Sequence, residues 1–173
     1  MHKNKGFTLI ELIVVTAIIG LLSAVVLTAL DSARAKTRDT TRKAEIGELQ
    51  KAITHYFTTN GSYPTTAGVW LSSEIGDTCG GGCSYNANWI PSIVGANMIQ
   101  KLPNDPKGGI NNACTGTQYR AYVYRSDGQH YKLISNCSLE KDAYPAAGSK
   151  FYDPQRATWA IQVTDSYTAT AAW

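Results

Sequence analysis

The chain has 173 residues, enough for about one domain. Its formal net charge at pH 7 is only +3, and two of the positive residues, Lys3 and Lys5, precede the first long apolar run. A nearly neutral protein gives no general argument for a nucleic-acid partner. The apolar residues are concentrated near the start of the chain, which makes that segment the first one to explain.

The amino-terminal segment changes abruptly from polar to strongly apolar. Residues 1–6 (MHKNKG) are polar and basic, whereas residues 7–30 (FTLIELIVVTAIIGLLSAVVLTAL) are apolar with few interruptions. As a helix, residues 7–30 extend over about 36 Å, which exceeds the roughly 30 Å of a bilayer's hydrocarbon core. The composition therefore predicts one membrane-spanning helix preceded by a short basic leader.

The helical pattern continues beyond the apolar segment. No proline interrupts residues 31–58, and Ile46, Leu49 and Ile53 follow the three-then-four spacing of one helix face. Asn60-Gly61 then supplies a helix-terminating signal. The sequence predicts a single long helix whose second half, residues 31–58, is an amphipathic continuation outside the membrane.

Residues 59–173 have the composition of a globular, β-rich head. The region up to residue 118 is rich in Gly, Asn, Ser and Pro, with a short helix expected near Ser92–Lys101. Tyr- and Val-rich runs flank Asp127-Gly128 and predict a β-hairpin, and a further strand is expected at Thr158–Val163. The expected fold class is therefore α+β, with the long helix packed on a small antiparallel sheet.

Glu11 is the residue of the apolar segment that most needs an explanation. A carboxylate at the centre of a membrane-spanning helix costs about 3 kcal/mol on insertion scales, and such residues are usually functional. Alternatively, Glu11 lies near enough to the interface for its carboxylate to reach water. Taken alone, the residue leaves both interpretations open.

The neighbours of Glu11 form a specific motif. The run Lys5-Gly6-Phe7-Thr8-Leu9-Ile10-Glu11-Leu12 resembles the processing motif of type IV pilins and type II secretion pseudopilins. The resemblance covers the leader and the apolar segment, and more loosely the helix that follows. It implies cleavage by a prepilin peptidase between Gly6 and Phe7, followed by N-methylation of Phe7. It further implies that Glu11 pairs with the N-terminal amine of a neighbouring subunit.

The same resemblance implies a location and a set of partners. Lys3 and Lys5 are expected to hold the leader in the cytoplasm, while a single-pass helix anchors the chain in the cytoplasmic membrane and the head is exported. The mature chain is expected to polymerise with copies of itself into a periplasmic or cell-surface filament. The other expected partners are the prepilin peptidase, the pilus or secretion assembly machinery and, before assembly, membrane lipid; no cofactor is implied.

Two features depart from the family pattern. Many pilins have a proline eight residues after the position of Gly20, where this chain has Thr28. The basic residues from Arg34 to Lys43 also outnumber those of the leader, which on charge alone would keep the head inside, although long domains are exported despite such charges. This basic run is expected either to be a solvated helix face or to pair with neighbouring subunits.

Other interpretations remain open at this point. Ala33-Arg34-Ala35 fits an ordinary signal-peptidase site, and cleavage after Ala35 would release a soluble secreted domain without Glu11. A single-pass anchored binding protein that never polymerises is a second alternative. Within the filament class, Leu102-Pro103-Asn104-Asp105-Pro106 resembles a segment of major pseudopilins, whereas the cysteine-rich head favours a surface pilin. No catalytic motif is present in the sequence, so a structural subunit is expected rather than an enzyme.

The four cysteines all follow the membrane segment: Cys79, Cys83, Cys114 and Cys137. In that position they predict disulfides in an oxidising compartment rather than a zinc site, since no His or CxxC pair lies nearby. Four cysteines allow three connectivities. The hairpin turn places Cys137 opposite the neighbourhood of residue 118, which favours Cys114–Cys137, with Cys79–Cys83 closing the triple-glycine loop.

Two further features have both a functional and a structural interpretation. Asp105 is a candidate calcium ligand, but no other ligands can be named, and a proline-flanked turn with an Asx-type hydrogen bond is preferred. The tryptophans could form an adhesive or ligand-binding surface, but core and loop anchors are preferred. They are Trp70, Trp89, Trp159 and Trp173.

Overall fold

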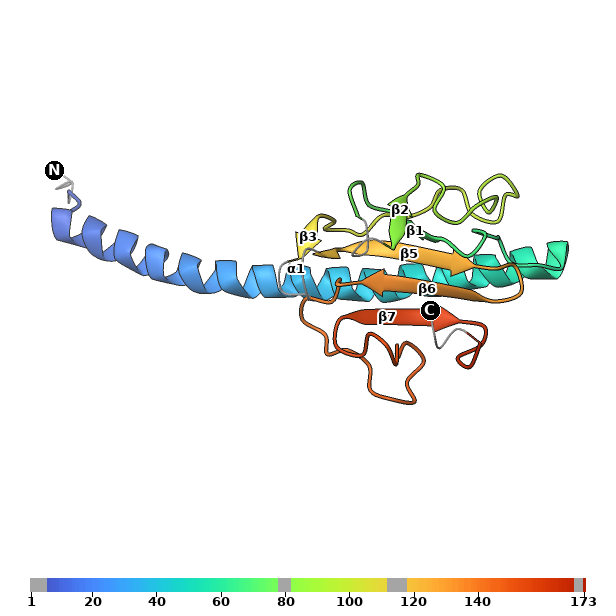
Figure 1. Ribbon diagram of the computed structural model, residues 1–173. Coiled ribbons are helices and arrows are strands. Elements are labelled where there is room, and N and C mark those ends of the chain that lie inside the picture. Colours follow the sequence, from blue (N-terminus) through green and yellow to red (C-terminus); the bar gives the residue numbers. More distant parts are fainter. Residues whose placement is uncertain (1–5, 78–81, 112–117, 170–172) are drawn as a thin grey trace.

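The structure is a computed structural model that describes residues 6–77, 82–111, 118–169 and 173. One helix, α1 (Leu9–Asn60), has 52 residues and forms a long stem. A head built on a β-sheet packs against the second half of this helix, and the first half extends beyond the head (Figure 1). The long helix that the sequence predicts is present.

Both ends of α1 are formed by residues of the expected types. Thr8 is the N-cap, and its hydroxyl and the Glu11 side chain make reciprocal bonds to the backbone in a capping box. At the other end Gly61 has φ 74°, and its N–H donates to the carbonyl of Phe57 at 2.8 Å. Glycine adopts this left-handed conformation without steric cost, so it ends the helix at the residue that the sequence indicated.

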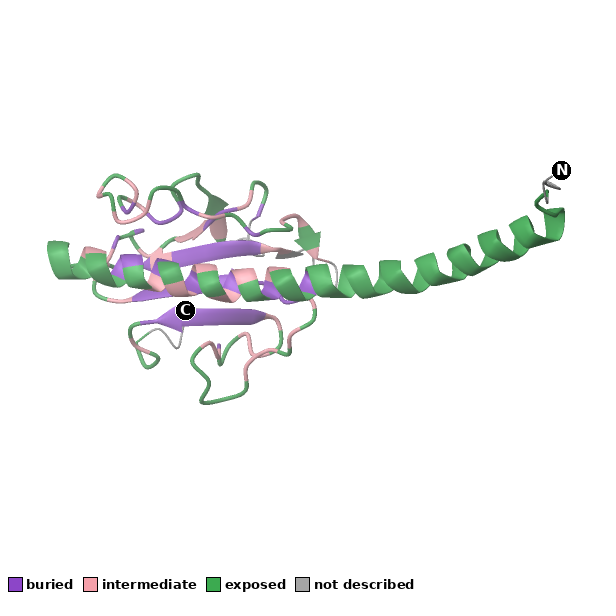
Figure 2. Cartoon of the chain, turned by 180° about the vertical axis from the view of Figure 1, so that it is seen from behind, coloured by how far each residue is buried: buried purple, intermediate pink, exposed green. Residues whose placement is uncertain are grey.

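The burial of α1 divides the helix into two parts. The portion before Ala35 is exposed along its length, and the portion after it is buried along one stripe (Figure 2). Except for the adjacent Ala52 and Ile53, the buried residues follow one another at steps of three or four, as expected for one helix face. They are Ala35, Asp39, Arg42, Ile46, Leu49, Ala52 and Ile53.

The main sheet has five strands in the order β2-β1-β5-β6-β7. All neighbouring strands are antiparallel except the parallel pair β1 and β2. The bounds are β1 (Trp70–Ser72), β2 (Cys83–Tyr85), β5 (Ala121–Ser126), β6 (Tyr131–Asn136) and β7 (Ala160–Thr164). A separate antiparallel pair is formed by β3 (Ile110–Asn111) and β4 (Gln118–Tyr119). This arrangement confirms the α+β fold class.

The predicted hairpin is present with a longer loop than expected. Ser126 pairs with Tyr131, so residues 127–130 form the connection and Asn136 lies opposite Ala121. The Asp127 carboxylate accepts the N–H groups of residues 129 and 130, at 2.9 and 2.8 Å, which stabilises the longer loop. The register therefore differs by two residues from the expected one. A shift of two leaves every side chain on its expected face of the sheet.

Two other expectations have different outcomes. The strand expected at Thr158–Val163 is confirmed by β7, whereas the short helix expected near Ser92–Lys101 is wrong. That segment consists of turns, because Ser92 and Asn97 have φ 63° and 56° and interrupt any helix. The short strands β1 and β2 were not predicted within the loop-rich region.

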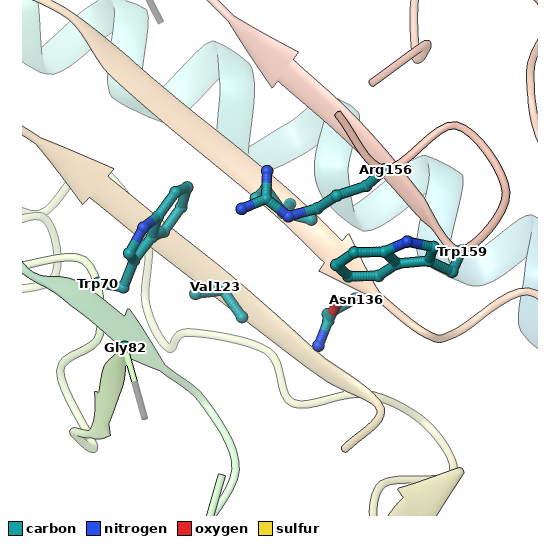
Figure 3. Close-up of a pocket in the computed structure, with 7 residues that line it drawn as sticks. Trp70, Gly82, Val123, Asn136, Arg156 and Trp159 are labelled. Carbon is teal, nitrogen blue, oxygen red and sulfur yellow. The ribbon is translucent and has the colours of Figure 1, made fainter. Parts of the chain in front are cut away.

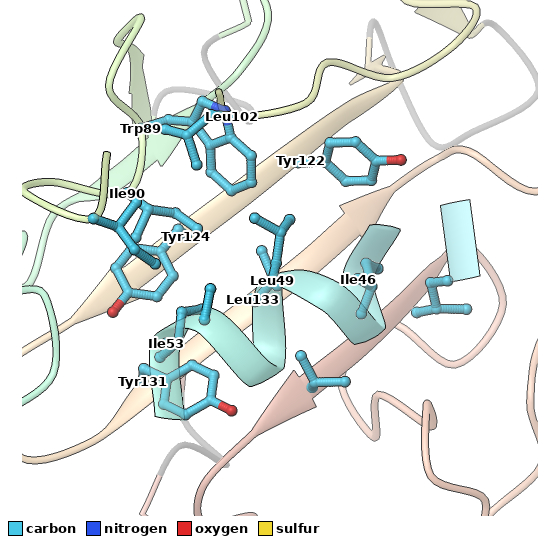
Figure 4. Close-up of a cluster of buried hydrophobic side chains, with 14 of the residues drawn as sticks. Ile46, Leu49, Ile53, Trp89, Ile90, Leu102, Tyr122, Tyr124, Tyr131 and Leu133 are labelled. Carbon is cyan, nitrogen blue, oxygen red and sulfur yellow. The ribbon is translucent and has the colours of Figure 1, made fainter. Parts of the chain in front are cut away.

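The hydrophobic core lies between α1 and one face of the sheet (Figure 4). Ile46, Leu49 and Ile53 of the helix are fully buried there. The sheet contributes alternate residues of its strands, as expected for a sheet that buries one face against a helix. These include Tyr122, Tyr124, Leu133, Ile161 and Val163, and Trp89 packs on the Tyr122 ring with centroids 5.9 Å apart.

A buried ion cluster joins α1 to the head where the stem leaves the core. The guanidinium of Arg42 is fully buried and donates to both carboxylate oxygens of Asp105, at 2.7 and 2.9 Å. It also donates to Asp39 at 2.9 Å and to Glu140 at 3.1 Å. A buried charge requires such partners, since an unpaired one is strongly destabilising.

The same cluster attaches residues 140–142 of the head to the helix. The Asp39 carboxylate accepts the N–H groups of these three residues, and Arg38 donates two hydrogen bonds to Glu140 at 2.7 and 2.8 Å. Lys36 and Lys43 both contact Asp142. A solvated helix face was one of the two roles expected for the basic run. Four of its residues instead pair with carboxylates of the head, so the run is not only a solvated face.

The replacement Arg42→Met tests the cluster. It leaves the buried carboxylates of Asp39 and Asp105 without their cation, so we expect the free energy of unfolding to fall by about 3–5 kcal/mol. The control is Lys51→Met, which removes an exposed pair with Glu48 and should change the value by less than about 1 kcal/mol. Both are measured by denaturant unfolding of the full-length chain in detergent. Equal effects of the two replacements would contradict a stabilising role for the cluster.

Glu140 makes the stability depend on pH. Hydrogen bonds from Arg38, and also from Lys107 and Arg42, lower the pKa of the Glu140 carboxyl below its ordinary value of 4.5. The unfolded chain therefore binds this proton first, and stability falls as the pH drops through the lower folded-state value. We expect the thermal midpoint to fall less in Glu140→Gln than in the unmodified chain between about pH 6 and about pH 3. Parallel curves for the two proteins would rule out this contribution.

Candidate functional site

The first half of α1 exposes a continuous apolar surface. Phe7, Leu9 and Leu21 are 74%, 75% and 71% exposed, and the large apolar residues between them are exposed as well. Among the described residues α1 is the helix long and apolar enough to cross a membrane, with a mean hydropathy of 2.7 in its most apolar window and no part of that window buried. So much apolar surface requires cover from lipid or from other protein.

The predicted cleavage position lies just outside the helix. Gly6 and Phe7 precede the N-cap, and Thr8 has extended backbone angles, φ −86° and ψ 152°. A Cβ atom added at Gly6 would have no neighbouring heavy atom within 4 Å, so the space on that side of the backbone is open. An exposed, non-helical peptide bond is the form in which a peptidase can bind the chain.

Glu11 has a local role that the sequence interpretation did not include. Its Oε2 atom accepts hydrogen bonds from the Thr8 N–H at 2.8 Å and from the Thr8 hydroxyl at 2.6 Å. The pattern Thr8-x-x-Glu11 is the capping-box signature, which could have revealed this role in the sequence. The Oε1 atom has no hydrogen bond among the described residues. One carboxylate oxygen therefore caps its own helix and the other is available.

The apolar half of α1 is an uninterrupted helix. Thr28, at the position where many pilins have proline, donates its hydroxyl to the carbonyl of Val25 at 2.9 Å. Thr16 donates to the carbonyl of Ile13 in the same way, also at 2.9 Å. These bonds satisfy the hydroxyl groups of the two threonines within the helix, as an apolar environment requires. Gly20 lies within the helix, with no atom within 4 Å of a side chain added there.

The competing signal-peptidase site lies in a different environment. Ala35 is only 6% exposed and sits inside α1, with helical residues on both sides. The following residue, Lys36, contacts Asp142 of the head. Cleavage after Ala35 requires unwinding of a helix that the head packs against, whereas the peptide bond after Gly6 is already exposed.

Asp105 lies in the turn that was preferred for it. Its Oδ1 atom accepts the N–H groups of Lys107 and Gly108 at 2.9 and 3.0 Å, which is an Asx-type arrangement. Both carboxylate oxygens also bind Arg42. A calcium ion takes 6–8 oxygen ligands, and in the described parts of the chain no group of three or more Asp, Glu, His or Cys side chains is arranged to hold a metal ion.

The structure describes two of the four cysteines, Cys83 and Cys137. Cys83 starts β2, and Cys137 follows β6 with a positive φ of 50°. Neither is a free thiol. Their predicted partners, Cys79 and Cys114, lie outside the described residues. The pairings Cys79–Cys83 and Cys114–Cys137 therefore stay predictions.

Comparisons with known proteins agree with the geometry of the stem. The family described as the prokaryotic N-terminal methylation motif matches residues 1–27. A fimbrial protein of Neisseria meningitidis serogroup B is 47% identical over 130 residues, which cover 72% of this chain and 69% of the relative. No solved structure matches the chain.

Two further relatives come from a secretion system and from a type IV pilus. The type II secretion system core protein G of Escherichia coli is 30% identical over 145 residues, covering 80% of this chain and 94% of the relative. The type IV wide pilus major component PilA4 of Thermus thermophilus is 37% identical over 78 residues, covering 45% and 60% of the two chains. The chain is thus a membrane-anchored, filament-forming structural subunit, and it belongs to the family of type IV pilins and type II secretion pseudopilins.

Proposed function

We propose that the chain is the precursor of a type IV pilus subunit. Residues 1–6 are its leader, removed by a prepilin peptidase between Gly6 and Phe7, and the new amino terminus at Phe7 is then N-methylated. Residues 7–30 form the membrane and assembly segment, residues 31–58 continue the helix, and residues 59–173 form the head. The observation that carries the proposal is the exposed apolar half of α1. In its first turn Glu11 caps the helix with one carboxylate oxygen, and the other oxygen has no hydrogen bond among the described residues.

The exposed stem supports assembly with copies of the same chain. Before assembly lipid covers it, because its length and hydropathy suit a bilayer. In a filament outside the membrane, the same side chains must be covered by the stems of other subunits. Apolar residues occur around the whole circumference of this segment, so each stem suits a core of packed helices rather than a single flat contact.

Glu11 supports a defined contact within that core. Its Oε2 caps the helix of its own subunit, and its Oε1 remains for a donor from elsewhere. Removal of the leader creates an amine at Phe7, four residues before Glu11 in the sequence. Burying either charge alone in an apolar core is strongly unfavourable. A pair between this amine and Glu11 of a neighbouring subunit offsets that cost for both charges.

Export of the head follows from two features. Lys3 and Lys5 favour a cytoplasmic leader, and a long domain is translocated despite the basic residues at the end of the stem. Cys83 and Cys137 are not free thiols, which suits an oxidising compartment outside the cytoplasm. The proposed pairings Cys79–Cys83 and Cys114–Cys137 belong to this exported head.

A second candidate function is that of a major pseudopilin in a type II secretion-like system. It is favoured by the turn at Leu102-Pro103-Asn104-Asp105-Pro106, the segment that resembles pseudopilins, which is anchored here by Arg42. The two candidates share the same processing and stem chemistry. They differ in whether the chain forms long filaments on the cell surface when its own cells produce it at the normal level.

The first test is the intact mass and amino-terminal sequence of the protein purified from its own cell surface and membranes. We expect a chain that begins with N-methylated Phe7, because the bond after Gly6 is exposed and non-helical. A chain that begins at Lys36 indicates ordinary secretion, and an intact Met1 indicates a plain membrane anchor. Either of these two results refutes the proposal.

The second test separates the two roles of Glu11 by the replacement Glu11→Gln. Glutamine also serves at this position of a capping box, so the helix and the membrane precursor should persist. The charge is lost, and we expect the filament yield, measured by shearing and electron microscopy, to fall by about tenfold or more because an unpaired amine stays in the core. Asp31→Asn, at the exposed far end of the stem, is the matched control. Normal filament yield from Glu11→Gln would exclude the proposed pair.

A further inference from the structure

The tryptophans of the head occupy two different environments. Trp89 lies in the core between the sheet and α1 and is 1% exposed. Trp70, Trp159 and Trp173 instead gather around two arginines, Arg125 and Arg156, each of which lies over two of the indole rings. The function proposed above makes no use of this aromatic and basic cluster.

The cluster lies on the face of the sheet opposite α1. Val123 of β5 and Ile134 of β6 pair with each other, and they alternate with Tyr122 and Leu133, which point into the core. Because successive side chains of a strand point to opposite faces, Val123 and Ile134 point away from the helix. They form the apolar floor of a cavity (Figure 3).

This cavity has the size of a small ring. Its volume is about 130 Å³. A cavity of about 150 Å³ in another protein holds benzene, so this one holds a group about as large as one unsubstituted ring, and the substituents of a sugar must extend out of it. Figure 3 shows the Arg156 side chain reaching over the sheet between Trp70 and Trp159. The described lining residues are Trp70, Gly82, Val123, Ile134, Asn136, Arg156 and Trp159.

Arg156 presents an incompletely bonded guanidinium to the cavity. Its central carbon lies 5.4 Å from the Trp70 ring and 5.6 Å from the Trp159 ring. Nη1 donates to Asp153 at 3.3 Å and to the carbonyl of Trp173 at 2.9 Å. Nε and Nη2 make no hydrogen bond among the described residues, and 18% of the side chain is exposed. A guanidinium with free donors is suited to two parallel bonds with a carboxylate.

The surroundings of Arg156 carry an excess of positive charge. Arg125 lies 5.7 Å from the Trp70 ring, and its buried Nε has no hydrogen-bond partner among the described residues. Lys132 is 1% exposed and pairs with Asp153 at 3.3 Å, so this one carboxylate is shared by Lys132 and Arg156. Lys132 and Arg156 also donate to the same oxygen of Trp173, at 3.0 and 2.9 Å. These two cations therefore share Asp153 and the Trp173 oxygen, whereas Arg125 pairs with no carboxylate among the described residues, and an anionic ligand would supply one.

We propose that this cavity binds a six-membered sugar ring that carries a carboxylate, as in a uronic or sialic acid residue of a polysaccharide or glycan. The indole rings of Trp70 and Trp159 and the apolar floor pack against the C–H face of the ring. Arg156 binds the carboxylate, and the edge of Asn136 lies beside the ring hydroxyls. The mixture of apolar walls, one polar edge and one open guanidinium matches this ligand better than it matches a purely aromatic acid.

Nucleic acid is a poorer match for the same residues. Single strands bind along grooves that combine stacking aromatic side chains with positive charge beside successive phosphates. Here the positive charge gathers around one cavity that accepts a single ring, and the chain as a whole carries only +3. In a filament with the stems at its centre, the face opposite α1 is directed outward. The accessibility of the cavity in a filament rests on the proposed function. Binding of the sugar by the isolated chain does not depend on that function.

The test is a binding titration of the full-length chain in detergent, followed by tryptophan fluorescence and calorimetry. The probes are trigalacturonate, sialyllactose, the neutral maltotriose and a thymidine oligonucleotide. We expect at least one of the two acidic sugars to bind at least about tenfold more tightly than maltotriose. Arg156→Gln and Trp159→Leu should each weaken that binding by about tenfold or more. Lys51→Gln, an exposed cation of the stem, should leave it unchanged.

Arg156→Gln is the decisive variant if Trp159→Leu fails to fold. It should fold, because Asp153 keeps Lys132 and the N–H of Gln155 as partners. Equal binding of neutral and acidic sugars, no binding below about 10 mM, or unchanged binding by Arg156→Gln overturns the proposal. Tighter binding of the oligonucleotide with the same variant sensitivity overturns it in favour of nucleic acid. Filament yield is measured in parallel, so that failure of sugar binding is distinguished from failure of assembly.

Discussion

The buried guanidinium of Arg42 is the interaction on which the arrangement of stem and head depends. It binds Asp39 on its own helix, Asp105 in the loop before β3 and Glu140 after β6. Three distant parts of the chain are therefore joined at the point where α1 leaves the hydrophobic core. Breaking a buried pair of this kind leaves charges without partners, so an arrangement of stem and head that separates them is strongly disfavoured. The head is thereby held in one orientation beside an exposed stem.

The stem has to be stable in two environments, lipid and the interior of a filament. Its threonine hydroxyls bond to backbone carbonyls of the same helix, so these groups do not depend on water. Glu11 differs from these threonines, because its cap uses one carboxylate oxygen and leaves the other unbonded among the described residues. An unbonded carboxylate oxygen is tolerable near a membrane interface but costly in a packed apolar core. In the proposed filament, this oxygen therefore needs a hydrogen-bond donor from a neighbouring subunit.

The sheet separates the two surfaces of the head. Tyr122 and Leu133 face α1 and hold the head on the stem, whereas Val123 and Ile134, the next residues along the same strands, face the cavity beneath Arg156. The alternation of strand side chains thus lets one short hairpin pack against the core on one face and line the cavity on the other. Changes on the outer face can alter what the surface binds without changing the core.

The sequence alone determined the features that depend on neighbouring residues. The apolar run, the helix and its glycine end, the hairpin, and the motif around Gly6, Phe7 and Glu11 are contiguous in the chain and follow local rules. The capping box of Thr8 and Glu11 also has a recognisable sequence pattern. Such features need no knowledge of which distant segments meet.

Tertiary structure decided the contacts between segments far apart in the chain. Arg42 and Glu140 are 98 residues apart in sequence, and no local pattern links them. The same holds for the parallel pairing of β1 with β2, and for the meeting of Trp70 with Arg156. The hairpin register also differed from expectation, since side-chain bonds of Asp127 stabilise a longer loop than the dipeptide signal implies. Contacts between distant segments depend on how the whole core packs. Local patterns of charge and turn residues do not indicate which distant residues will meet.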